Sequence, residues 1–271
     1  MVKAMFKNEL VSAAAKQLAS DYCCNAEDFA CKNNTVTLAG ITEGRRIFRA
    51  EPDFFKVGTM GNGAVITAAS EMLDFANELA GKYGGAEIFE LTKIREINEQ
   101  LAKYNKAIAF NSIFYLPLVP YEYVPNNNFK LKFYEKSEII SELYPAKGFN
   151  NALMYDSTKP RHDVLAVCAF DNGQIIGMAG ASNDSERFWQ IGIDVLPEYR
   201  GNGIGKECAN VLLTWAKENS ALYAELNYDG NDRRLCFWKS VGFIENGVDE
   251  WGEPLMLLPP NDEVPFAVKV L

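Results

Sequence analysis

The sequence is poor in the residues that build metal and disulfide sites. It contains one histidine, His162, and six cysteines in 271 residues. The cysteines are too few and too irregularly spaced for a disulfide framework. Cys23, Cys24 and Cys31 cluster, but they lack the spacing of a zinc finger and lie far from His162 in the sequence. We therefore expect no metal site, and we interpret most of the cysteines as small core residues.

Long apolar runs are also missing. No stretch of about 18 apolar residues is free of charge, which argues against a membrane span. The opening segment, residues 1–20, carries three lysines and a glutamate among its apolar residues and so lacks the apolar stretch of a secretory signal. We interpret it as an amphipathic helix and expect a cytoplasmic protein without a membrane partner.

Positive charge is in deficit. The chain has 27 Lys and Arg against 36 Asp and Glu, a net charge of -9, and most of the excess lies after residue 125. Nucleic-acid binding needs clustered basic residues, so a nucleic-acid partner is not expected. An acidic surface would attract a cationic substrate and repel an anionic ligand, which would then have to be held by local chemistry.

What remains is the composition of a soluble globular protein, with 48% hydrophobic and 23% charged residues. The length favours two domains. We place their boundary near residue 125, because Pro125 and the asparagines at 126–128 fit an exposed linker. The expected domains are residues 1–125 and 126–271.

The first domain is predicted to be α/β. Ser70 is expected to cap the second helix, and the turn at 59–63 joins two strands into a hairpin. The expected helices are 2–21, 70–79 and 92–104, and the expected strands are 35–39, 54–57, 64–68 and 108–119.

The second domain mixes hairpins with strand–helix–strand crossovers, which predicts a mixed sheet. The Asp171–Asn172–Gly173 turn should join two antiparallel strands. The expected strands are 129–134, 163–170, 174–181, 188–196, 222–228 and 254–258, with an edge strand at 265–271; the expected helices are 137–144, 149–155, 204–219 and 232–240.

The most informative segment runs from Ile193 to Gly205 and joins a strand to a helix. Glycines alternate at 201, 203 and 205, which leaves backbone amides open to an anion at a helix N-terminus. A tight connection without any ligand remains the alternative. A nucleotide-triphosphate loop is excluded twice, because Lys206 is followed by Glu207 and because Arg200 stands where the first glycine is needed. A dinucleotide fingerprint would need a third glycine at Lys206, although Glu225 lies at the spacing of its acidic residue.

The run Arg200–Gly201–Asn202–Gly203–Ile204–Gly205, preceded by Val195, Pro197 and Tyr199, resembles the acetyl-CoA motif of the GNAT family of N-acetyltransferases. Asn231 and the segment 237–243 resemble the family's second motif. The resemblance covers residues 128–260, about half of the chain. It implies a mixed, mostly antiparallel sheet flanked by helices, and an α/β (α+β) fold class overall.

The resemblance also assigns roles. It implies that the amides of residues 200–205 bind the pyrophosphate of acetyl-CoA. It further implies that Ile193 and Val195 offer backbone groups to the pantetheine arm, and that the Val195 N–H donates to the thioester oxygen. Asn231 and Trp238 would lie beside the cofactor.

Acetyl transfer needs a neutral amine, although an alkylamine is almost fully protonated at pH 7. Candidate bases are Asp194 and Glu225, each of which could equally be a solvated surface group, while Gln190 could orient a water. Trp238 stands where many family members have a tyrosine that protonates the leaving thiolate, so Tyr228 or a water would take that role. Cys208 and Cys236 could form a covalent acetyl intermediate, but neither has a neighbouring histidine, and core packing explains them better.

The sequence therefore predicts an N-acetyltransferase that moves an acetyl group from acetyl-CoA to a primary amine of a small molecule or a protein. Residues 1–125 could shape the acceptor pocket. A sensor that binds acetyl-CoA without turnover is the alternative, and a scaffold with a vestigial loop is a third possibility. The acceptor and the oligomeric state are left open.

Overall fold

A computed structural model gives the structure of the chain. It describes residues 2–47, 50–109, 112–115, 129–185, 188–218, 223–228 and 267–270. The chain divides into two compact units, which are considered separately. The first comprises residues 1–118, 227–231 and 244–271, and the second comprises residues 119–226 and 232–243. The expected boundary near residue 125 lies outside the described residues and stays a prediction.

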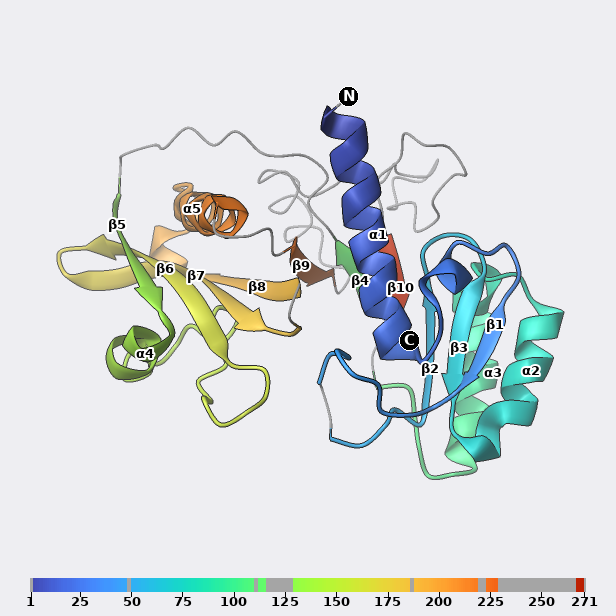
Figure 1. Cartoon of the computed structure of the whole chain (residues 1–271). Helices are drawn as coiled ribbons and strands as arrows, with labels where there is room; N and C mark the ends of the chain where they lie inside the picture. Colours follow the sequence, from blue (N-terminus) through green and yellow to red (C-terminus); the bar gives the residue numbers. More distant parts are fainter. Residues whose placement is uncertain are drawn as a thin grey trace. The chain divides into compact units, whose positions relative to one another are not determined.

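The first unit contains a five-stranded mixed sheet in the order β1-β3-β2-β10-β4 (Figure 1). β1 and β3 run parallel, while β3, β2, β10 and β4 pair antiparallel in turn. The predicted hairpin of β2 and β3 is confirmed. The strands are β1 (Thr35–Leu38), β2 (Phe55–Thr59), β3 (Ala64–Ala68), β4 (Ser112–Tyr115) and β10 (Ala267–Val270).

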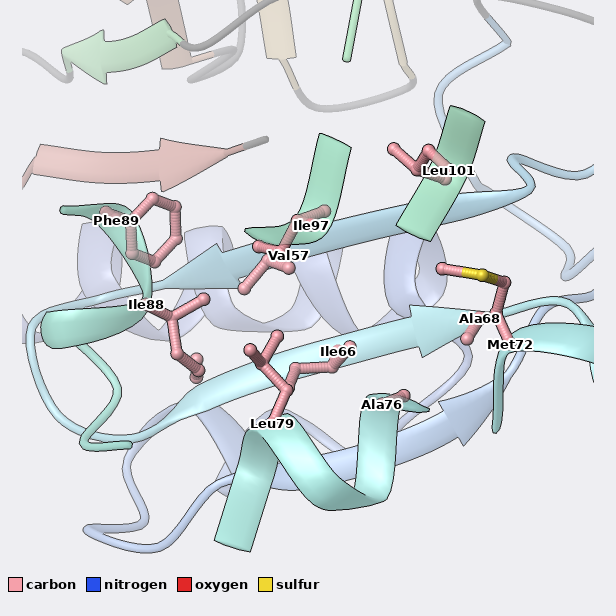
Figure 2. Close-up of a cluster of buried hydrophobic side chains, with 11 residues drawn as sticks. Val57, Ile66, Ala68, Met72, Ala76, Leu79, Ile88, Phe89, Ile97 and Leu101 are labelled. Carbon is pink, nitrogen blue, oxygen red and sulfur yellow. The ribbon is translucent and has the colours of Figure 1, made fainter. Parts of the chain in front are cut away.

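Helices cover both faces of this sheet. α2 (Leu73–Lys82) and α3 (Leu91–Ala102) lie on one face, where their side chains meet Val57 and Ile66 in a fully buried core (Figure 2). α1 (Val2–Tyr22) lies on the other face, where the Tyr22 hydroxyl donates to the Val57 carbonyl at 3.3 Å. All five residues of β3 are buried because both faces are covered.

Two expectations for this part of the chain are wrong. The segment 267–270 is not an edge strand: its two sides pair with β2 and β4, in the interior of the first sheet. Ser70 does not cap the second helix, because a single 3-10 turn, η2 (Ser70–Met72), comes first and the Ser70 hydroxyl donates to Glu71. α2 then begins after Met72, which offers no side-chain cap.

The second unit contains the mixed, mostly antiparallel sheet that the sequence predicts. Its strand order is β5-β6-β7-β8-β9, and only β8 and β9 run parallel, joined by helix α5 (Ile204–Glu218). Asn172 and Gly173 have φ angles of 48° and 84°, as a two-residue turn between β6 and β7 requires. The strands are β5 (Lys130–Glu135), β6 (Asp163–Asp171), β7 (Gln174–Asn183), β8 (Phe188–Val195) and β9 (Tyr223–Tyr228).

This sheet is also covered on both faces. Helix α5 lies on one face, where Ile204 packs so closely that a Cβ on Gly177 would stand 2.5 Å from its Cγ2 atom. The opposite face is covered by α4 (Lys136–Glu138), the wide π-helical turn η4 (Ile139–Leu143) and the segment 149–155. The residues of β8 therefore alternate between a helix-facing row at 189, 191, 193 and 195 and a second row at 188, 190, 192 and 194.

The predicted helix at 149–155 does not form. Its backbone donors go to two carboxylates instead of to carbonyls four residues back: Asp194 accepts from the amides of Asn151 and Ala152, and Asp163 accepts from those of Met154 and Tyr155. A helical bond from Leu153 to Phe149 remains. The predicted helix 232–240 and strand 254–258 lie outside the described residues, and within the described residues no helix is both long and apolar enough to cross a membrane.

Candidate functional site

The glycine loop after β8 has a backbone shape that needs glycine. The 3-10 turn η5 (Pro197–Tyr199) leads from β8 into the loop. Gly201 and Gly203 then have φ angles of 84° and 81°, in the left-handed region that other residues rarely adopt. A Cβ on either glycine would meet no atom within 4 Å, so the space into which a side chain would project is open.

Three hydrogen bonds fix the loop from behind. The Tyr199 hydroxyl donates to Asp171 Oδ2 at 3.0 Å, and the Asn202 side-chain amide donates to the Tyr199 carbonyl at 3.1 Å. The Arg200 Nε atom donates to the Val195 carbonyl at 3.0 Å. These bonds use side-chain donors, while the backbone N–H groups of Tyr199 and Arg200 donate to the carbonyls of Leu196 and Pro197.

The N–H groups of residues 201–206 find no acceptor among the described residues. Residues 204–206 begin α5, whose first turn cannot bond them internally, and the helix dipole adds partial positive charge at the same end. Gly201, Asn202 and Gly203 are exposed, whereas Ile204 is buried at 1% and anchors the turn in the core. The Arg200 N–H already donates to the Pro197 carbonyl, so that predicted donor is not available, and the donors suited to an anion are the N–H groups of residues 201–206.

β8 also has an open edge next to the loop. Its register with β9 runs from the Phe188–Tyr223 pair to the Gln190–Glu225 pair, and past Gln190 no further pair joins the described parts of these strands. The Leu196 amide donates to the Ile176 carbonyl, so Val195 lies in a non-hydrogen-bonded pair with Gly177. Because such pairs alternate, the backbone groups of Ile193 and Val195 face away from β7 and toward this open edge.

Asp194 lies on the other side of the strand. Its carboxylate accepts hydrogen bonds from the Asn151 amide at 2.7 Å, the Asn151 side chain at 2.5 Å and the Ala152 amide at 3.0 Å. These bonds hold the 149–155 segment on the sheet. Asp194 therefore serves the architecture of the site, and its role as a base stays a prediction.

A charged network at the start of β8 was missed in the sequence. The Arg161 Nε atom bonds Asp184 Oδ1 at 2.9 Å, and its terminal nitrogen donates to Gln190 Oε1 at 2.8 Å. The Ser182 hydroxyl also donates to Asp184, which is 3% exposed. Arg161 lies in a loop and Asp184 at a strand end, so no local pattern connects them.

The remaining predicted residues are only partly placed. Glu225 lies opposite Gln190 in the parallel register and Tyr228 ends β9, but the side chains of both lie outside the described residues. Asn231 and Trp238 lie wholly outside them. In the part of the chain that the structure describes, no three His, Cys, Asp or Glu side chains gather as a metal site.

Burial makes Cys208 a poor nucleophile. It is 0% exposed on the inner face of α5, and burial, reinforced by Glu207, raises the pKa of its thiol to about 12. At pH 8 the thiolate fraction is then about one in ten thousand. We predict that iodoacetamide at pH 8 labels the exposed Cys31 of the folded protein and leaves Cys208 unlabelled until denaturant is added, as peptide mass mapping would show. Labelling of folded Cys208 at the rate of Cys31 would contradict this.

Comparison with known proteins identifies the second unit. Residues 126–243 match the model of the family described as "Acetyltransferase (GNAT) family". No curated protein matches the chain. Because the matched segment contains β5 to β9, the glycine loop and α5, the family assignment covers the whole candidate site.

Three of the solved structures that match the chain carry related descriptions. A putative GNAT acetyltransferase from Novosphingobium aromaticivorans is 10% identical, with a TM-score of 0.36, over 59% of this chain and 63% of that one. A GCN5-related N-acetyltransferase-like protein from Streptococcus suis is 15% identical, with a TM-score of 0.41, over 57% and 64%. A putative streptothricin acetyltransferase from Bacillus anthracis, solved with acetyl coenzyme A, is 22% identical, with a TM-score of 0.30, over 46% and 66%. The chain thus spans less than two thirds of the length of each of these three structures.

Proposed function

We propose that this chain, whose residues 126–243 form a GNAT acetyltransferase domain, transfers an acetyl group from acetyl-CoA to a primary amine of a small molecule or a protein. One observation carries the proposal: the amides of residues 201–206 find no acceptor in the described part of the chain, and they follow a strand whose edge beyond Gln190 pairs with none of the described residues. The loop amides offer a site for an anion, and the adjoining edge of β8 offers backbone groups to an extended ligand. The two together suit a ligand with a diphosphate and an amide-containing arm.

The residues of the loop fit the diphosphate. Gly201 and Gly203 carry no side chain that could block its approach, and their amides and those of the first turn of α5 supply the donors. Local donors are needed because the chain carries a net charge of -9 and would otherwise repel an anion. Asn231 and Trp238 would complete the site.

The open edge of β8 fits the pantetheine arm. Ile193 presents both its N–H and its carbonyl toward this edge, whereas the carbonyl of Val195 is already bonded to Arg200. The two amides of the arm can pair with such an edge as a neighbouring strand would. The bound thioester supplies the activated acetyl group.

The acceptor amine must lose a proton before it attacks, because an alkylamine has a pKa near 10.4. Of the two carboxylates considered, Asp194 is committed to the 149–155 segment, which leaves Glu225 as the better candidate for the base, directly or through a water. Tyr228 or a water would protonate the leaving thiolate. The acidity of the chain favours a cationic acceptor.

Binding and turnover can be tested separately. We expect calorimetry to show binding of both acetyl-CoA and free coenzyme A, and we expect free thiol to accumulate when acetyl-CoA is mixed with at least one member of a panel of amines. Thiol release can be followed with a chromogenic disulfide reagent. Absence of heat with both ligands would refute the proposed function.

The same experiment distinguishes the alternative. Asp194 is engaged in three hydrogen bonds, which limits it as a base. A protein that binds acetyl-CoA but has no effective base would act as a sensor. Tight binding without thiol release from any amine would favour that function. Release above the spontaneous rate establishes the enzyme.

A further inference from the structure

We infer that Gln190 is a catalytic residue whose side-chain amide donates a hydrogen bond to the carbonyl oxygen of the bound acetyl thioester. The inference rests on the proposed function and deepens it. It starts from the network of Arg161, Asp184 and Gln190, which neither the glycine loop nor the open strand edge requires.

Arg161 fixes the orientation of the Gln190 amide. A guanidinium group can only donate, so the Gln190 atom that lies 2.8 Å from it must be the oxygen. The amide nitrogen then points away from Arg161 with two N–H donors. No described residue accepts from this nitrogen, and the side chain is only half-buried, so a ligand can reach it.

A buried aspartate keeps Arg161 in place. Asp184 has no exposed side-chain surface, binds Arg161 at 2.9 Å and accepts a 2.7 Å bond from Ser182, the residue directly opposite Gln190 on β7. Because separating a buried ion pair is costly, the guanidinium cannot easily leave. The network therefore presents the Gln190 donor in a fixed geometry, as stabilisation of developing charge requires.

Gln190 also lies where the reactive end of the ligand should be. It is the last residue of β8 that pairs with the described residues of β9, so the edge that these residues leave open begins there and ends at Val195, beside the glycine loop. The five residue steps from Gln190 to Val195 span roughly 17 Å of strand. A pantetheine arm extended along this edge from a diphosphate at the loop covers a similar length, which brings its thioester to the Gln190 end.

This position separates Gln190 from the Val195 N–H, the donor that the family resemblance implies. Val195 lies next to the loop and would meet the start of the arm. In the transfer step the amine nitrogen forms a bond to the acetyl carbon, the carbon–sulfur bond breaks, and the thiolate leaves with the electron pair. The base takes the amine proton, and Gln190 stabilises the negative charge on the carbonyl oxygen without transferring a proton.

Two substitutions remove the donor in different ways. Gln190→Glu keeps an oxygen for Arg161, so the network and the fold should persist, while Gln190→Leu removes the donor without adding charge. Gln174→Glu is the matched control, because Gln174 is an exposed glutamine at the start of β7. Each full-length variant is titrated with acetyl-CoA and with free coenzyme A, and turnover is measured with an amine that the wild-type protein acetylates.

We expect both Gln190 variants to lower kcat by about a hundredfold, the usual effect of losing one such donor. The Kd for acetyl-CoA should rise by about threefold to tenfold while the Kd for coenzyme A, which lacks the carbonyl, stays within twofold. The carbonyl stretch of carbon-13-labelled acetyl-CoA should move to higher frequency in both variants. Gln174→Glu should match the wild type in every measurement.

Wild-type-like kcat in both Gln190 variants would overturn the inference, as would an equal loss of affinity for both ligands. An altered pH profile with unchanged discrimination between the two ligands would also overturn it, because Gln190 would then act on the base. These outcomes differ from failure of the proposed function, in which the wild-type protein binds neither ligand.

Discussion

Replacing Gly203 with valine is expected to weaken binding of acetyl-CoA by about a thousandfold, because it places a branched side chain where the diphosphate should lie. Two or three hydrogen bonds to a charged group would be lost or displaced, and each contributes about 1.5 to 3 kcal/mol. The fold should survive, since a Cβ at Gly203 meets no atom within 4 Å. Calorimetry with acetyl-CoA and with coenzyme A measures the effect, which should be the same for both.

The control must share the backbone strain of this substitution. Gly173, in the turn between β6 and β7, has a φ angle of 84° against 81° for Gly203, and a Cβ there also meets open space. Gly173→Val should therefore lower the melting temperature about as much as Gly203→Val while leaving the Kd unchanged. If both variants keep wild-type affinity, the loop is not the diphosphate site.

Local patterns in the sequence predict much of this fold, because turn residues and apolar periodicity determine many of its strands, turns and helices. The predicted strand 64–68 matches β3, and the turn at Asn172 and Gly173 forms as its residue types require. The apolar row at Ile204, Cys208 and Trp215 predicts the helix α5, which begins at Ile204 as expected. Each of these features depends on residues that are near in sequence.

Two of the errors come from contacts that helical or strand periodicity does not contain. Four backbone donors in 149–155 bind Asp163 and Asp194, and neither carboxylate could be linked to the segment from helical periodicity alone. The segment 267–270 has a strand-like pattern, but its pairing with both β2 and β4 depends on partners more than 150 residues earlier, about which the pattern says nothing.

The candidate site divides in the same way. The glycine loop was predicted because alternate glycines before a helix leave its N-terminal amides open, and the structure shows left-handed angles at Gly201 and Gly203. The role of Gln190 could not be predicted, because its meaning comes from Arg161, 29 residues earlier. The packing of the 149–155 segment on the sheet did leave a signal in the sequence. Gly180 and Gly192 lie inside strands, where glycine often marks a close approach of another backbone.

Gly192→Ala is expected to destabilise the second unit by about 3 kcal/mol, because a Cβ there would overlap the Asn151 carbonyl. Gly180 lies directly opposite on β7, and a Cβ there would overlap the Ala152 carbonyl in the same way. The backbone of residues 151 and 152 therefore packs directly against the two glycines. An added methyl group would lift this segment and break its hydrogen bonds to Asp194. Denaturant unfolding measures the loss, and hydrogen exchange at the Asn151 and Ala152 amides shows where it occurs.

The opposite outcome is expected at a glycine without such a neighbour. Gly81 lies near the end of α2, and a Cβ there meets nothing within 4 Å. Gly81→Ala should stabilise the protein by about 0.5 to 1 kcal/mol, since alanine favours a helix.

If Gly192→Ala is as stable as the wild type and the Asn151 and Ala152 amides stay protected from exchange, the 149–155 segment does not pack against the glycines. Because the same carboxylate, Asp194, links this segment to the strand that carries Gln190, the Gly192 variant should also lower turnover more than it lowers affinity for coenzyme A.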